Sequence, residues 1–61
     1  MAYYDKSMYP IAFFLTCMNI ICSERCCIYI MDFNTGAFRL RGDRADEAMN
    51  VLRNCGLLKE V

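Results

Sequence analysis

The sequence predicts a small α+β domain, in which a three-stranded antiparallel β-meander is covered on one face by a C-terminal α-helix. Three observations predict it: an apolar segment at residues 11–22, a turn signature within residues 26–41, and an amphipathic segment at residues 43–55. The 61 residues are expected to form one domain, and a chain of this size buries only about 60% of its unfolded surface. The alternative arrangement is helix, β-hairpin, helix, which follows if residues 11–22 are helical.

Residues 1–10 combine three tyrosines with Asp5, Lys6 and Ser7. We expect them to form an arm or a leading extended segment, not a core element. Pro10 marks a boundary, because proline biases the preceding residue toward extended backbone and has no N–H to donate. The start of the chain has no signal-peptide pattern, and the longest apolar run is shorter than the ~20 residues of a membrane-spanning helix. We therefore expect a cytoplasmic chain without a membrane contact.

Residues 11–22 are apolar on every side, so hydrophobic periodicity does not separate a buried strand from a buried helix. A helix here would have Ser7 as its N-cap and Pro10 in its first turn. The residue types favour a strand, because three Ile, two Phe, one Thr and two Cys outweigh Ala, Leu and Met. We therefore predict a strand at residues 11–22, followed by a polar reversal at residues 23–25, with a helix as the alternative.

Residues 26–41 predict a β-hairpin, because turn-forming residues stand between two apolar stretches. A four-residue loop at residues 33–36 ends on Gly36, where a left-handed conformation favours a residue without Cβ. Asp32 flanks the loop and is placed to accept hydrogen bonds from loop N–H groups. The loop length sets the register. In this register Asp32 faces Ala37, Met31 faces Phe38, Ile30 faces Arg39, Tyr29 faces Leu40, and Ile28 faces Arg41.

The predicted register gives the hairpin two faces, since neighbouring strand residues point to opposite sides. A three-residue loop would place both arginines beside Tyr29, Met31 and Phe33, so we prefer the register that separates charge from the core. Arg39 is then placed to pair with Asp32, a cross-strand contact of ~0.2–1 kcal/mol. The core face consists of Cys27, Tyr29, Met31, Phe38 and Leu40. The solvent face consists of Cys26, Ile28, Ile30, Asp32, Arg39 and Arg41.

Residues 43–55 predict an amphipathic helix that packs on the sheet. Asp43 is placed as the N-cap, and Asp46 and Glu47 lie in the first turn, where negative charge suits the helix dipole. Gly56 follows the helix as a left-handed C′ residue, with Leu57 placed for a Schellman-type contact with Leu52. Residues 58–61 are short enough to add an edge strand. The apolar stripe consists of Ala45, Ala48, Met49, Leu52 and Cys55.

Composition and motifs argue against catalysis. There is no histidine to act as a general base near neutral pH, and the three glycines are isolated instead of forming a phosphate-binding loop. We therefore expect no enzymatic activity and no cofactor. The cysteines are expected to be reduced thiols; as an alternative, they stabilise a zinc-binding mini-domain, although no C-x-x-C spacing is present. The five cysteines are Cys17, Cys22, Cys26, Cys27 and Cys55.

The surplus of apolar residues predicts that the chain works against a partner surface. Hydrophobic residues make up 57% of the chain and the formal net charge is zero, a combination that favours association. We expect an intracellular, homodimeric protein-interaction or inhibitory module that docks on a larger protein. Compact accessory proteins of phages and mobile elements are commonly of this physical type. The predicted contact residues are Ile28, Ile30, Arg39 and Arg41 on the hairpin, with Phe13 and Phe14 on the preceding segment.

Binding of nucleic acid is the alternative function. Two-stranded β-ribbons insert basic side chains into a DNA groove, and Arg39 and Arg41 share one face of the predicted hairpin. The neutral net charge weighs against this function, because sequence-independent affinity for nucleic acid comes from neutralised phosphates. The basic residues of the predicted ribbon are Arg25, Arg39, Arg41 and Arg44.

Overall fold

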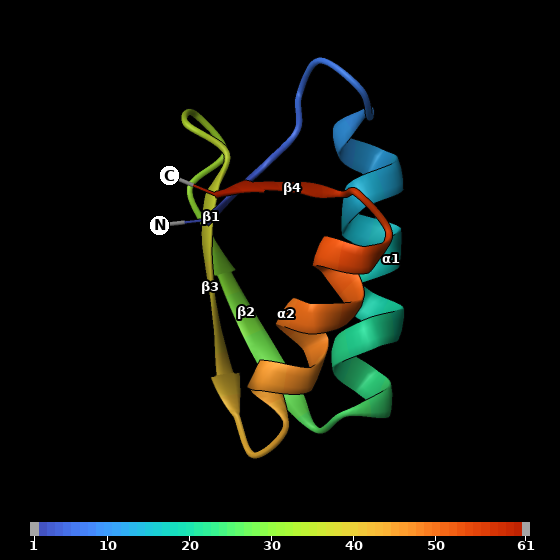
Figure 1. Cartoon of the computed structure of the whole chain (residues 1–61). Helices are drawn as coiled ribbons and strands as arrows, with labels where there is room; N and C mark the ends of the chain where they lie inside the picture. The colour runs from blue at the N-terminus through green and yellow to red at the C-terminus, as the bar shows by residue number, and fades with distance from the viewer. Residues whose placement is uncertain (1, 61) are drawn as a thin grey trace.

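The computed structural model describes residues 2–60, which form two α-helices and a four-stranded antiparallel sheet. This is the predicted α+β class, but it has one more helix and one more strand than the predicted meander. Both helices lie on the same side of the sheet (Figure 1). In chain order the elements are β1 (Ala2–Tyr4), α1 (Ile11–Glu24), β2 (Cys27–Met31), β3 (Ala37–Gly42), α2 (Ala45–Asn54) and β4 (Leu58–Glu60).

The strand order in the sheet is β2-β3-β1-β4. β1 is antiparallel to both β3 and β4, and β2 is antiparallel to β3. β1 and β2 therefore run in the same direction with β3 between them, and α1 connects them. α2 connects β3 to β4 in the same way, with β1 between. The predicted meander is thus replaced by the split βαβ arrangement of ferredoxin-like folds.

The hairpin of β2 and β3 confirms the predicted loop and register. Two backbone hydrogen bonds at Asp32 close the loop: its N–H donates to the Ala37 carbonyl and its carbonyl accepts the Gly36 N–H, each over 2.8 Å. Gly36 has a φ of 81°, the left-handed conformation that its position requires. The Asp32 carboxylate accepts the N–H of Asn34, as expected for a loop of this kind. The pairs are Met31 with Phe38, Ile30 with Arg39, Tyr29 with Leu40, and Ile28 with Arg41.

Residues 11–22, predicted as a strand, form most of helix α1, so that prediction is wrong. The helix begins at Ile11, directly after Pro10, and no side chain caps its N-terminus. Ser7, considered as a cap, instead donates hydrogen bonds to the Asp5 carboxylate. Packing against the sheet and α2 selects one helical stripe out of the uniformly apolar sequence. The buried residues of this stripe are Phe14, Met18, Ile21 and Cys22.

Residues 2–4, predicted to belong to an arm or a leading extended segment outside the core, form a strand in the middle of the sheet. β1 lies between β3 and β4, and Ala2 and Tyr4 are buried. These residues are therefore extended, as one of the two predictions had it, but they are a core element, contrary to the prediction, because β1 is paired on both sides. Met1, the first residue of the predicted arm, lies outside the described residues.

α2 confirms the predicted amphipathic helix, with corrections at its start and on its stripe. It begins at Ala45 with Arg44 at the N-cap and no side-chain cap, so Asp43 does not cap the helix. The backbone of Arg44 is not helical, which places the first helical residue later than predicted. Asp46 and Glu47 lie in the first turn, as predicted. On the stripe, Ala48 and Leu52 are buried, Ala45 and Met49 are partly buried, and Cys55 is exposed, contrary to the prediction.

The C-terminal end of α2 is the predicted Schellman motif. Gly56 has a φ of 72°, and its N–H donates to the Arg53 carbonyl over 3.0 Å. The N–H of Leu57 donates to the Leu52 carbonyl over 3.1 Å, and both leucine side chains are buried. The predicted edge strand follows as Leu58–Glu60, while the last predicted residue, Val61, lies outside the described residues.

The core lies between the sheet and the two helices. Phe14, Met18 and Leu52 are the largest fully buried side chains. The Phe14 ring lies 4.8 Å from the Tyr4 ring and 5.5 Å from the Phe38 ring, so it joins α1 to β1 and β3. Because both helices cover the same face, no helix of residues 2–60 covers the opposite face of the sheet (Figure 1).

Candidate protein-interaction surface

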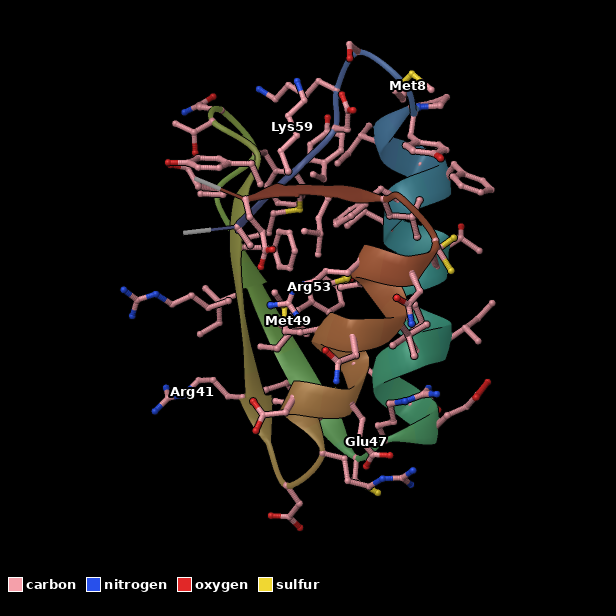
Figure 2. All side chains as sticks on the ribbon, in the orientation of Figure 1. Met8, Arg41, Glu47, Met49, Arg53 and Lys59 are labelled. Atoms are coloured by element: carbon pink, nitrogen blue, oxygen red, sulfur yellow. The ribbon has the colours of Figure 1, made fainter. Side chains whose placement is uncertain are left out.

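The uncovered side of the sheet carries the four hairpin residues that were predicted as contact residues. Ile28 and Ile30 of β2 are 64% and 54% exposed. Each lies directly opposite an exposed arginine of β3: Ile28 faces Arg41, and Ile30 faces Arg39. The side chain of Arg41 extends away from the helices (Figure 2). We call these four residues the open sheet face.

Neither arginine of the open sheet face has an ion pair or a side-chain hydrogen bond within residues 2–60. The predicted contact between Arg39 and Asp32 is therefore absent from this part of the chain. Asp32 instead accepts the N–H of Asn34 over 2.9 Å, which turns its carboxylate toward the loop. Both guanidinium groups present their N–H donors to the solvent, and a carboxylate or phosphate is the acceptor that fits their geometry.

The central and opposite edge strands continue the same side of the sheet. Tyr3 of β1 pairs with Ala37 of β3 and with Lys59 of β4, and its neighbours along β1 are buried. Tyr3 and Lys59 therefore lie on the side of the open sheet face. The Lys59 ammonium is 3.4 Å from the Asp5 carboxylate. Tyr3 and Lys59 were not predicted from the sequence, because only long-range strand pairing brings the two ends of the chain beside the hairpin.

A shallow depression of about 750 Å³ borders the open sheet face. It lies beside the part of β3 that β1 leaves unpaired, since within residues 2–60 β1 pairs with Ala37 and Phe38 alone. The charged groups in the depression are the guanidinium groups of Arg39 and Arg41. Because no lining residue within 2–60 has a carboxylate, thiol or hydroxyl group, the depression offers anion binding and apolar contact. The lining residues are Ala2, Ile30, Phe38, Arg39, Leu40, Arg41 and Met49.

The four arginines of the predicted nucleic-acid ribbon are divided between different parts of the molecule. Only Arg39 and Arg41 belong to the open sheet face. Arg25 is partly buried directly after α1 and donates to a carbonyl of that helix. Arg44 donates two hydrogen bonds to the Glu47 carboxylate. These bonds lower the pKa of Glu47 and raise the pKa of Arg44, so the two groups satisfy each other.

Phe13 and Phe14, predicted together as contact residues, lie on different sides of α1. Phe14 is completely buried in the core, so it is not available to a partner. Phe13 is 49% exposed, and its ring stacks on the Tyr9 ring at a centroid distance of 5.5 Å. Ile20, two helical turns further on, is 54% exposed and was not identified from the sequence. α1 therefore presents a second apolar surface, separate from the open sheet face.

The five cysteines are spread over the molecule. Cys26 and Cys55 are exposed, Cys22 and Cys27 are buried, and Cys17 is partly buried. Among residues 2–60, no three Cys, Asp or Glu side chains are grouped as metal ligands. Burial, together with the neighbouring thiol of Cys27, raises the pKa of Cys22 to about 12. Cys22 is therefore protonated at neutral pH, which makes it a poor nucleophile.

No similar protein identifies this chain. It matches no protein-family model, no curated protein and no solved structure. Within residues 2–60, no helix is long and apolar enough to cross a bilayer. Its function is therefore inferred from its own surface chemistry.

Proposed function

We propose that this chain is a protein-interaction module without catalytic activity, which docks on a larger protein through the open sheet face. The observation that carries the proposal is the exposure of Ile28 and Ile30 beside Arg39 and Arg41, which form no ion pair within residues 2–60. Exposed apolar groups with arginine are typical of protein interfaces, where arginine is enriched and supplies much of the binding energy.

The chemistry of this face favours a partner with an apolar patch flanked by carboxylates. Each isoleucine of β2 is directly opposite an arginine of β3, so an apolar row lies beside a cationic row. A guanidinium that loses its water on binding needs acceptors in return, and a carboxylate accepts two parallel hydrogen bonds from it. A module of this kind acts by covering a surface of its partner, and inhibition is one outcome of such covering.

The proposal is tested by immobilising the purified chain and comparing the proteins that it captures from the lysate of its source cell. The Arg39→Gln, Arg41→Gln variant removes both cations of the open sheet face. The matched control, Lys6→Gln with Arg44→Gln, removes two cations elsewhere. We expect the first variant to lose a specific partner that the wild type and the control retain. Loss of two well-ordered guanidinium contacts weakens binding by about a hundredfold or more.

Capture that is unchanged in the Arg39→Gln, Arg41→Gln variant would contradict docking through this face. An Ile28→Ser, Ile30→Ser variant provides the second arm, because it removes the apolar half and keeps both cations. If both variants retain the partner, another surface binds it. Circular dichroism of each variant checks that the fold is intact.

A second candidate function is binding of single-stranded nucleic acid on the same side of the sheet. The observation that favours it is that Arg39, Arg41 and Lys59 share this side with Tyr3, a combination of cations and an aromatic ring. A labelled oligonucleotide is titrated with protein at increasing salt. Nucleic-acid binding predicts measurable affinity at about 50 mM salt that falls steeply as salt rises, and no binding at this concentration removes the candidate.

A further inference from the structure

The two edges of the sheet differ in their protection against pairing with another strand. β4, at one edge, has three residues and carries Lys59 and Glu60. β2, at the other edge, has five residues, Cys27–Met31, with no charge, proline or glycine. Short length and charge are the usual means by which a sheet edge avoids pairing, and an unprotected apolar edge accepts a further strand. β4 has both means of protection and β2 has neither.

The surface of α1 beside the β2 edge is also uncharged. The Tyr29 hydroxyl donates to the Asn19 side chain over 2.8 Å, which places Asn19 above β2. Asn19 and Ser23 of α1 line a shallow groove of about 350 Å³ together with Ile28 of β2. Helical spacing puts Thr16 and Ala12 on the same side, and all four α1 residues are exposed. α1 has no charged residue before Glu24, so the edge and the helix form one continuous neutral side of the molecule.

We propose that a second copy of this chain covers this side, with β2 joined antiparallel to β2 of the partner subunit about a two-fold axis at Tyr29. Ile28 then lies opposite Ile30 of the partner subunit, and the two sheets become one of eight strands. A shift of one residue would turn the faces of the two sheets to opposite sides, so only even shifts keep all four helices together. Both sheets then present their open faces in the same direction.

The same axis brings the two α1 helices together. Because Asn19 lies beside Tyr29, the axis passes near the middle of the exposed α1 row formed by Ala12, Thr16, Asn19 and Ser23. It therefore brings Thr16 toward Ser23 of the partner subunit. The small side chains of this row permit the close approach of two helices, whose axes typically pack about 8–10 Å apart. Ile20 flanks this contact and becomes covered as well. One two-fold axis therefore covers both the unpaired edge of β2 and the uncharged surface of α1.

Charge and size favour a second copy as the occupant. A side without charged groups offers nothing to a charged partner, whereas it is complementary to itself across a two-fold axis. A standard interface buries about 800 Å² per partner, one fifth of the 3999 Å² surface of this chain. α1 and β2 run along the long dimension of a body of 29 × 21 × 20 Å, so this side is large enough. The β2–β2 dimer does not depend on the docking proposal.

The dimer is tested by sedimentation equilibrium of the purified chain across a concentration series. The wild type is expected at twice the 7.1 kDa chain mass. The Ile28→Lys, Ile30→Lys variant places four ammonium groups opposite one another across the axis, which weakens the dimer by about a hundredfold or more. The matched control, Met8→Lys with Phe33→Lys, removes two exposed apolar side chains away from the β2 edge and adds the same charge, so it is expected to remain dimeric.

Three outcomes would overturn the proposal: a monomeric wild type at high micromolar concentration, a dimer that survives Ile28→Lys, Ile30→Lys, or a control that dissociates equally. Hydrogen exchange of the wild type gives an independent measurement if the lysine variant fails to fold. Exchange protection of β2 amides is expected to increase with protein concentration, whereas that of β4 amides does not, and the reverse pattern contradicts the proposal. The Arg39→Gln, Arg41→Gln variant is expected to dimerise normally, so failure of docking and failure of dimerisation are separate results.

Discussion

The two faces of the β2–β3 hairpin have opposite relations to the rest of the chain. Phe38 and Cys27 point toward the helices and are almost completely buried, whereas Ile28 and Ile30, their neighbours in the same hairpin, remain mostly exposed. The exposed isoleucines are as apolar as the buried residues, so hydrophobicity alone does not decide which side chains enter the core. The position of the helices decides it. The covered face therefore supplies stability, and the open face is the one through which we propose that the chain docks on a partner.

The largest loss of stability is expected when a side chain is removed from the covered side. Phe14→Ala is expected to lower the free energy of unfolding by about 3–5 kcal/mol, because the ring is fully buried between Tyr4 and Phe38. Phe13→Ala is the matched control, since Phe13 is on the same helix and half exposed. Its loss is expected below about 1.5 kcal/mol. Urea denaturation followed by circular dichroism measures both, and equal losses would contradict the assignment of the covered side.

The second test acts where β3 ends and the chain turns toward α2. Gly42 has a φ of 136°, and a Cβ added there would lie 2.7 Å from the Cys26 carbonyl oxygen and 2.8 Å from the Cys27 Cα. Gly42→Ala is therefore expected to destabilise the protein by about 1–3 kcal/mol. Gly56→Ala is the control with a left-handed backbone but no clash, since the added Cβ would lie 4.0 Å from the Tyr9 hydroxyl, and its loss of stability is expected to be smaller. Thermal unfolding of both variants ranks them, and a larger loss at Gly56 would contradict the close approach.

The third prediction concerns the pH dependence of stability that comes from Cys22, a buried thiol of α1. The pKa of Cys22 is raised from 9.0 to about 12, so the folded state holds its proton more tightly than the unfolded state. The contribution of this thiol to stability is complete below pH 9 and is lost as pH rises toward 12. Urea midpoints are expected to fall across this window. Cys22→Ala is expected to reduce the fall, and an unchanged fall in this variant would contradict the raised pKa of Cys22.

The smallest effect is expected on the open face. Arg39→Gln is expected to change the free energy of unfolding by less than about 0.5 kcal/mol, because the guanidinium has no ion pair within residues 2–60. Arg53→Gln is the comparison, since Arg53 lies 2.7 Å from the Glu60 carboxylate and lowers its pKa. Its loss is expected to be larger than that of Arg39→Gln but still small, because solvent screens an exposed ion pair. A clear destabilisation by Arg39→Gln would show that the open face has a structural role.

The hairpin and α2 were predictable because their signals are local. Gly36 and Asp32 fix a loop whose geometry sets every strand pair after it. The N–H groups of Gly56 and Leu57 end α2 by donating to carbonyls three and five residues earlier in the chain. The start of α2 was predicted less well, since Asp43 has the chemistry of a cap but the backbone of Arg44 is not yet helical.

α1 shows the limit of residue types as a signal. Its sequence is apolar on all sides, so no pattern separates the buried Phe14 from the exposed Phe13. Strand-favouring residues were outweighed by packing, because a helix lets residues 11–24 connect two parallel strands across one face of the sheet. The open sheet face was predicted from the hairpin register, but its extension through Tyr3 and Lys59 was not.

Local signals in the sequence specify the hairpin, its two faces and the amphipathic helix that follows it, because turn geometry and side-chain periodicity act over a few residues. Long-range packing specifies that residues 11–24 are helical, that β1 lies between β3 and β4, and that both helices cover one face. These features depend on contacts between residues far apart in the chain, such as Ala2 with Phe38 and with Glu60. The free energy of such contacts comes from shared burial, which no single segment encodes.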